Sequence, residues 1–243
     1  MGSNRREWLR LFAAAGGSYL VASGSRAADR LTPAVSAVDH LLLGIGDLDH
    51  GLTRVRQMTG VKPAMGGSHP GVGTRNALLS LGGRRYLEII APDPAQTEFK
   101  FRIDLRKLSA PHLVTWAASA SDIEAVAARA REGGFEIFGP QAGSRTRPDG
   151  KVLRWKTLAV KTDLAADGVD PIPFFIEWAA DSQHPSLDSP AGCELRAFEI
   201  DHPDPQGVRN ALARLGIEAD VKSRERARLV ATLRTLKGTL KLV

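Results

Sequence analysis

The chain has 243 residues, 43% hydrophobic and 25% charged, which is the composition of an ordinary globular protein with a well-buried core. Half of the net charge of +6 lies in the first 27 residues, and the basic residues of the remainder are scattered among acidic ones, which argues against nucleic-acid binding. Cys193 is the single cysteine, so an intramolecular disulfide and a cysteine-rich zinc site are excluded.

Residues 1–27 are typical of an export signal. Arg5 and Arg6 precede bulky apolar residues and a weakly apolar segment that is too short to span a bilayer. Small residues up to Ala27 provide a cleavage site, and the whole segment resembles a twin-arginine signal. We therefore expect export to the periplasm without a stable membrane anchor. The alternative is an amphipathic N-terminal helix.

Residues 35–94 predict a strand, a helix and further strands. Asp47 is placed to cap the helix, and Gly60 is placed to end it. The predicted elements, in order, are a strand from residue 35, a helix over 48–59, a glycine-rich loop over 66–76, and strands over 77–81 and 84–91.

The same order of elements then recurs. Residues 112–180 predict a strand over 113–118, a helix over 123–131, and strands over 135–138, 151–161 and 173–179. Residues 190–243 predict a strand over 194–200, a helix over 205–215, and strands over 217–221, 228–235 and 240–243. Because strand follows strand without intervening helices, a parallel Rossmann sheet is disfavoured.

The repeat predicts an α+β fold of βαβββ modules, two complete and paired around a cleft in residues 35–180, and a third, partial module at the C-terminus. Residues 86–91 align with residues 175–180, which superposes Glu88 on Glu177, and a loop around 143–150 takes up the difference in length. The side chains expected in the core are Leu41, Leu43, Leu79, Ile89 and Phe175.

Four segments carry a resemblance to a known family. They are Val38-Asp39-His40-Leu41, the string from His69 to Gly82, the strand from Tyr86 to Pro94, and Pro173 to Trp178. Over roughly residues 35–205 the chain resembles the vicinal-oxygen-chelate superfamily, and more narrowly its glyoxalase-like domains. The resemblance implies paired βαβββ modules whose curved sheets enclose a cleft, with metal ligands on the first and last strand of each module.

Three residues on separate predicted strands are candidate metal ligands: His40, Glu88 and Glu177. One imidazole and two carboxylates suit Zn²⁺, Mn²⁺, Fe²⁺ or Ni²⁺. Thr115, a weak ligand, stands where the second module would supply the partner of His40. The site therefore has either three protein ligands with open positions, or no metal and the role of a binding pocket. A core histidine with satisfied strand carboxylates is the plain structural alternative.

The glycine-rich loop brings three further candidates. Arg75 could pair with a carboxylate or phosphate, and Asn76 could orient a carbonyl group. We expect both, together with His69, to bind substrate. A strand connection with turn glycines is the alternative. His184 and His202 each precede a proline and are expected at the surface or as caps.

The leading functional hypothesis is a metal-dependent lyase or isomerase that acts on a small, oxygen-rich substrate, with Glu177 as the catalytic base. The runner-up is a metal-free protein that binds or sequesters a small molecule on the same fold. A ring-cleaving dioxygenase is less favoured, because it needs two histidines and a carboxylate, and one suitably placed histidine is visible. A homodimer is left open.

Overall fold

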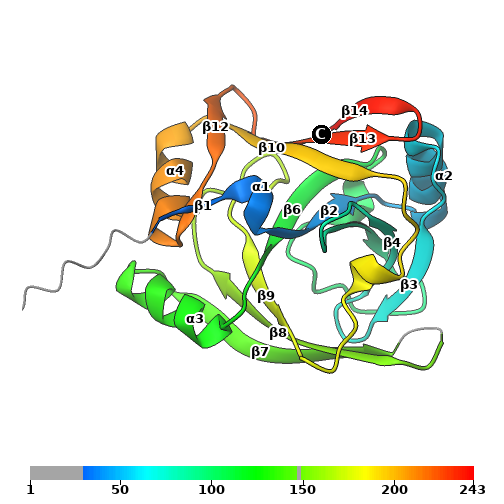
Figure 1. Ribbon diagram of the computed structural model, residues 1–243, viewed down its shortest axis with the longest axis horizontal. Helices are drawn as coiled ribbons and strands as arrows, with labels where there is room; N and C mark the ends of the chain where they lie inside the picture. Colours follow the sequence, from blue (N-terminus) through cyan, green and yellow to red (C-terminus); the bar gives the residue numbers. More distant parts are fainter. Residues whose placement is uncertain (1–29, 147–148) are drawn as a thin grey trace, which may run out of the picture.

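The computed structural model describes residues 30–146 and 149–243, so the predicted signal over 1–27 lies outside the described residues. The described chain is a mixed α+β structure of one large sheet, one smaller sheet and a two-stranded ribbon (Figure 1). The predicted α+β fold is confirmed. No described helix combines the length and apolar character needed to cross a membrane.

The large sheet has eight strands in the order β3-β4-β5-β2-β6-β9-β8-β7. One half is β2 (Val38–Gly44), α2 (Leu48–Thr59), β3 (Ala64–His69), β4 (Thr74–Ser80) and β5 (Tyr86–Pro92). The other half is β6 (His112–Ser119), α3 (Ile123–Glu132), β7 (Ile137–Thr146), β8 (Val152–Val160) and β9 (Phe174–Trp178). In each half the first strand pairs in parallel with the last, and β2 joins β6 in antiparallel orientation.

Local signals explain the helices. Asp47 accepts a hydrogen bond from the backbone N–H of His50 at the start of α2, and Gly60 ends that helix in the left-handed conformation. Asp122 caps α3 in the same way. Two predicted loops were wrong: residues 66–76 are most of β3, a turn and the start of β4, and β7 continues to Thr146. Glycine content suggested loops where the chain forms strands with bulges.

A third set of elements follows the large sheet in the chain. It contains β10 (Glu194–His202), α4 (Pro205–Arg214), β11 (Ile217–Glu218), β12 (Asp220–Ser223), β13 (Arg228–Thr235) and β14 (Gly238–Leu242). The order in its sheet is β12-β10-β13-β14, so the first strand lies between the later ones and does not pair with the last. The short segments outside these sets are β1 (Thr32–Pro33), α1 (Ala34–Ala37), η1 (Leu105–Lys107) and η2 (Pro185–Leu187).

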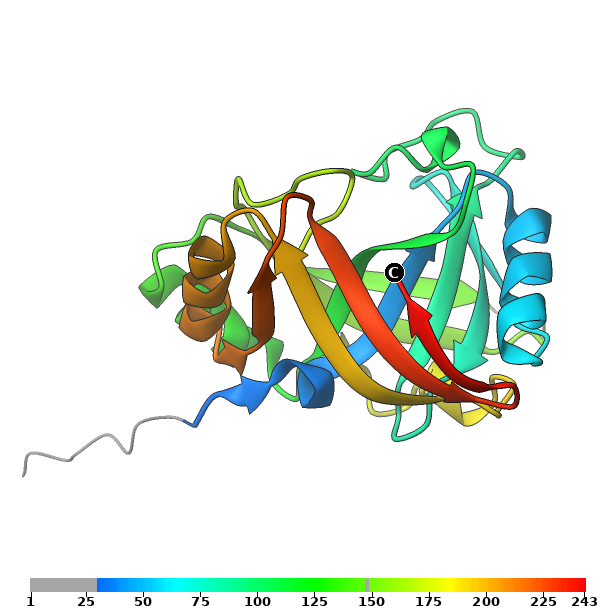
Figure 2. The same ribbon diagram turned by 90° about the horizontal axis from the view of Figure 1, so that it is seen from above.

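The smaller sheet lies across β2 and β6 on the outer face of the large sheet (Figure 2). Trp116 of β6 meets Phe198 of β10 edge-on, with ring centroids 5.1 Å apart. One apolar cluster joins both sheets with α2, α3 and α4. It includes all five predicted core residues, which are buried: Leu41, Leu43, Leu79, Ile89 and Phe175.

The large sheet curls until its two edge strands meet. Arg145 of β7 donates a hydrogen bond to the carbonyl of Gly66 in β3, across the gap between the edges. Because successive strand residues point to opposite faces, the residues between the core positions of β2 and β5 point to the inner face. The curl therefore encloses a cleft on that face.

Candidate active site

The cleft inside the curled sheet has a volume of about 540 Å³, a size typical of small-molecule sites. Its polar residues come mainly from β2, β3, β4 and β5, and they include four residues expected from the sequence: His40, His69, Asn76 and Glu88. The opposite wall comes mainly from β7, β8 and β9.

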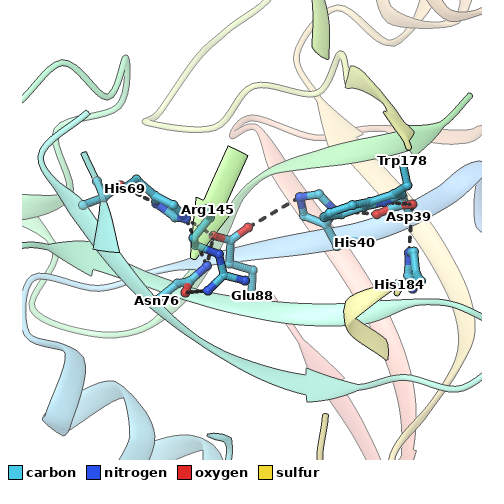
Figure 3. Close-up of polar contacts among 9 residues, drawn as sticks. Asp39, His40, His69, Asn76, Glu88, Arg145, Trp178 and His184 are labelled. Carbon is cyan, nitrogen blue, oxygen red and sulfur yellow. Dashed lines mark hydrogen bonds and ion pairs between the residues drawn. The ribbon is translucent and has the colours of Figure 1, made fainter. Parts of the chain in front are cut away.

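His40 is held by the neighbouring carboxylate. Its Nδ1 lies 2.7 Å from Oδ1 of Asp39, and both side chains are buried (Figure 3). The ring also stacks on Tyr86, which pairs with His40 across the strands, with centroids 4.5 Å apart. These contacts define the plane of the imidazole and direct Nε2 toward Glu88.

Asp39 accepts hydrogen bonds from three ring N–H groups. Besides His40, Nε2 of His184 and Nε1 of Trp178 each lie 3.1 Å from Oδ2. The backbone N–H of Ser186 donates to Nδ1 of His184, so the ring proton of His184 sits on Nε2. Burial alone would raise the pKa of Asp39, but the bonds from His184 and His40 outweigh it and lower the pKa from 3.8 to about 2. Asp39 is therefore a carboxylate at neutral pH.

Glu88 faces His40 from the adjacent strand. Its Oε2 lies 3.5 Å from Nε2 of His40, and its Oε1 accepts a 2.7 Å hydrogen bond from the amide of Asn76. The carbonyl oxygen of Asn76 in turn lies 3.5 Å from Nη1 of Arg145, which fixes the amide with its N–H group toward Glu88. Figure 3 shows these side chains converging from β2, β4, β5 and β7.

His69 completes the polar group. Its Nδ1 lies 2.8 Å from the hydroxyl of Thr74, and its Nε2 lies 3.2 Å from the amide nitrogen of Asn76 and 3.7 Å from Glu88. Burial lowers the pKa of His69, with Glu88 opposing the shift. A neutral ring with its proton on Nδ1 satisfies both hydrogen bonds.

The hydrogen bond with Asp39 determines which ring nitrogen of His40 faces Glu88. Because Asp39 is ionised and can only accept, Nδ1 of His40 carries a proton, and Nε2 is left as the atom that faces Glu88. Nε2 lies 3.5 Å from Oε2 of Glu88, and both residues line the cleft. A pair of this kind can give a proton to one atom of a substrate and take one from another.

Glu177 does not join this group. Its Oε2 accepts a 2.6 Å hydrogen bond from the backbone N–H of Ile123, the first residue of α3. The residues of β9 that line the cleft are Phe174, Ile176 and Trp178. The alignment of Glu88 with Glu177 was thus displaced by one position, which reverses the face of a strand residue. The structure therefore does not bring Glu177 together with His40 and Glu88, as a shared metal site or a base in the cleft would need.

Two further sequence expectations are corrected by position on the strand. Arg75 lies between the cleft-lining residues Thr74 and Asn76, so its side chain points to the opposite face, where it interacts electrostatically with Asp93. Thr115 is buried opposite Leu42, with its hydroxyl 3.5 Å from Arg102, and it is not a lining residue of the cleft.

The donor set does not fit a metal shared between the two modules, because the second module presents apolar side chains where ligands are expected. Among residues 30–146 and 149–243, no group of three or more His, Cys, Asp and Glu side chains is arranged to hold a metal ion. His40 and His69 flank the two oxygens of Glu88, but the amide N–H group of Asn76 contacts both Glu88 and His69. The N–H group of Asn76 therefore lies between Glu88 and His69, where a metal ion would have to bind.

The sequence did not reveal three members of the site: Asp39, Arg145 and His184. His184 caps η2, as expected, but it is also buried against Asp39, 145 positions away in the chain. Arg145 lay in a predicted loop. Asp39 adjoins His40, and an acidic neighbour of a candidate histidine is the one signal that could have drawn attention to it. His202 was expected at the surface or as a cap; it is buried, and its Nδ1 accepts a hydrogen bond from the backbone N–H of Asp204, the residue that caps α4.

A family model described as a glyoxalase-like domain matches residues 38–216. No curated protein matches the chain. A hypothetical protein from Staphylococcus aureus shares the fold, with a TM-score of 0.60 and 15% identity over 79% of this chain and 87% of that one.

Two further solved structures are more distant. The methylmalonyl-CoA epimerase of Mycobacterium tuberculosis has a TM-score of 0.41 and 21% identity over 61% of this chain and 91% of its own. A hypothetical protein from Bacillus halodurans has a TM-score of 0.40 and 17% identity over 60% and 95%.

Proposed function

The chain belongs to the glyoxalase-like domain family, and from that premise we propose that it is an enzyme that moves a proton on a small, oxygen-rich substrate bound in the cleft. The observation that carries the proposal is the buried Asp39–His40–Glu88 series, in which Nε2 of His40 and the carboxylate of Glu88 face each other at the cleft. A cleft that only bound ligand would not require a carboxylate behind the histidine.

The chemistry follows from the two facing atoms. With a proton on Nε2 of His40, the carboxylate of Glu88 takes the proton of a C–H group that bears a hydroxyl and adjoins a carbonyl, and Nε2 gives its proton to the carbonyl oxygen. The product is an enediol, with Glu88 protonated and His40 neutral. Glu88 then gives its proton to the former carbonyl carbon while Nε2 takes the proton of the other hydroxyl, which yields the isomeric hydroxy carbonyl compound and restores both side chains. Asp39 stabilises the ring of His40 in its charged state, and Asn76 holds Glu88 in place.

Solvent exchange tests this proposal with a panel of simple carbonyl compounds. Small 2-hydroxy ketones and 2-oxo acids are incubated with the protein in D₂O, and loss of the C–H signal beside the carbonyl is followed by NMR. We expect exchange of at least one compound to be about 100-fold slower with Glu88→Gln. Glu177→Gln is the matched control, because this glutamate lies outside the cleft.

The outcome also separates the proposal from simple binding. If no compound exchanges faster than in buffer, or if Glu88→Gln exchanges as fast as the wild type, the proton-transfer proposal is abandoned. A metal-free protein that binds or sequesters a small molecule is then the better account of the cleft.

Metal-dependent chemistry is a second candidate, supported by the positions of His40 and His69 beside the oxygens of Glu88, 3.5 and 3.7 Å away. Two imidazoles and a carboxylate would suit Zn²⁺, Mn²⁺, Fe²⁺ or Ni²⁺, and they have the composition used by ring-cleaving dioxygenases. Asn76 would have to turn away first. One equivalent of metal in protein purified without chelator, lost in His40→Ala, would favour this candidate over the first.

A further inference from the structure

The cleft has two unlike walls. The proposed proton-transferring groups, His40 and Glu88, come from β2 and β5, whereas the opposite wall carries most of the aromatic side chains, beside four polar residues: Gln141, Ser144, Arg145 and Thr157. The apolar side chains that matter are Phe101, Trp155, Phe174, Ile176 and Trp178. A substrate whose reacting atoms lie at His40 and Glu88 therefore contacts aromatic side chains on the opposite wall.

The aromatic side chains are only partly covered by the protein. Phe101, Trp155, Phe174 and Trp178 all line the cleft and are all half-buried. The rings of Trp155 and Trp178 are tilted against each other, with centroids 5.5 Å apart. A ligand that covers these exposed ring faces removes apolar surface from water, which stabilises the complex. An aromatic ligand stabilises it further, because ring pairs have favourable stacked and edge-to-face geometries.

The aromatic wall begins beside the reacting atoms. The ring of Phe174 meets the imidazole of His40 edge-on, with centroids 5.6 Å apart. A substrate whose oxygens lie at His40 and Glu88 therefore extends its next group along Phe174. His40 and Glu88 account for a small oxygen-rich head, and the aromatic side chains of the cleft favour a second, apolar part of the same molecule.

The position of the Trp155 indole depends on a glycine in the neighbouring strand. Gly143 of β7 pairs with Trp155 of β8, and a Cβ atom added at Gly143 would lie 2.6 Å from the indole nitrogen. The indole therefore lies directly over the backbone of β7, where only glycine leaves room for it. The ring is preorganised before any ligand arrives.

From these contacts we infer that the substrate carries a planar aromatic group attached to a head with adjacent oxygens, and that Trp155 and Phe174 select for that group. The inference deepens the proposed function and rests on it, because the oxygens are assigned to the His40–Glu88 end. Selection acts on the part of the molecule that does not react.

Three probes with the same head test the inference on the full-length chain. Phenylglyoxylate, cyclohexylglyoxylate and pyruvate share a ketone beside a carboxylate and differ in an aromatic, a saturated or a minimal substituent. Dissociation constants come from NMR titrations that follow the indole N–H signal of Trp155 and the ring signals of His40. We expect phenylglyoxylate to bind about tenfold more tightly than pyruvate, with cyclohexylglyoxylate between them.

Two variants assign the preference to Trp155. Trp155→Ala should reduce the preference for phenylglyoxylate over pyruvate to about twofold, measured on the His40 signals alone. Gly143→Ala keeps the tryptophan but displaces its indole, so it should also weaken this preference. Phe138→Ala is the control, because Phe138 is exposed and does not line the cleft. Circular dichroism confirms that each variant is folded, and a preference unchanged in both folded cleft variants overturns the inference.

The failure of the inference can be distinguished from the failure of the proposed function. If all three probes shift the His40 signals with similar dissociation constants, the aromatic selection is refuted and the proton-transfer proposal stands. If no probe shifts them, the head is not bound at His40 and the inference is refuted, whereas the proton-transfer proposal is decided by the exchange experiment in D₂O.

Discussion

Asp39 is the residue on which the order of the site depends, although it does not face the cleft itself. Its carboxylate receives N–H groups from β2, from β9 and from the segment before η2, and so ties three distant parts of the chain to His40. A buried carboxylate with three donors is stable only while it remains ionised.

This dependence predicts an acid-sensitive contribution to stability. Because the pKa of Asp39 is lower in the folded state than its value of 3.8 when unfolded, the unfolded chain takes up the proton first as the pH falls. A contribution of about 2 kcal/mol, present above pH 3.8, should therefore be lost as the pH approaches about 2.

Denaturant unfolding between pH 7 and pH 2 measures this contribution. The free energy of unfolding of the wild type should fall more steeply below pH 4 than that of Asp39→Asn, which has no proton to take up. Asp47→Asn, at an exposed helix cap, serves as the control. Parallel pH profiles for wild type and Asp39→Asn would show that the carboxylate is not stabilised by the fold.

At the same scale, four site residues could be predicted from the sequence: His40, His69, Asn76 and Glu88 all line the cleft. Residue type, together with position in the segments that resemble the family, was sufficient to identify them. Arg75 was predicted with Asn76, yet neighbours on one strand cannot both face the cleft. Assigning the segment to a loop concealed that contradiction.

At the scale of elements, β9 shows why strand faces are hard to assign from sequence. Phe174, Ile176 and Trp178 face the cleft, and Phe175 on the other face lies in the core, so both faces of the strand are apolar. Alternation of polar and apolar residues then carries no information about orientation. Helix boundaries were better predicted, because aspartate caps and terminal glycines act locally.

The position of Glu177 makes it a helix cap instead of a ligand, and this predicts the effect of its removal. Glu177→Ala should destabilise the protein by about 1 kcal/mol, because the first N–H group of α3 loses its acceptor and a negative charge leaves the helix N-terminus. Denaturant unfolding measures the loss. Glu136→Ala, which breaks an exposed ion pair with Lys161, is the control.

Activity completes the test of Glu177. The variant should retain exchange of the C–H proton in D₂O at the wild-type rate, since the side chain does not line the cleft. A loss of exchange rate comparable to that of Glu88→Gln would show that Glu177 takes part in the reaction.

At the scale of the whole molecule, the third set of elements determines which face of the large sheet is open. The smaller sheet and the helices cover the outer face, so the inner face is left for the cleft. The order βαβββ was predicted for this region, but its strand order differs from that of the first two modules. Element order can be inferred from local patterns, whereas strand pairing depends on contacts between distant residues.

Export remains a prediction, because residues 1–27 lie outside the described chain. Changing Arg5 and Arg6 together to lysine should abolish most of the export, since the folded-protein route depends on the arginine pair. Immunoblots of periplasmic and cytoplasmic fractions measure the effect, with Arg10→Lys as the control. Undiminished export of the double variant would exclude a twin-arginine signal.

The contact between β3 and β7 also affects whether copies of the protein aggregate with one another. Open sheet edges are templates on which further strands can add, and proteins blunt them with bulges, proline and buried or charged side chains. Both edges here are interrupted, β3 between Met65 and Gly67 and β7 between Phe138 and Gln141, where Pro140 lacks a donor. Arg145 then bridges the two strands. The curl that forms the cleft thus also protects a strand-rich protein against aggregation through its edges.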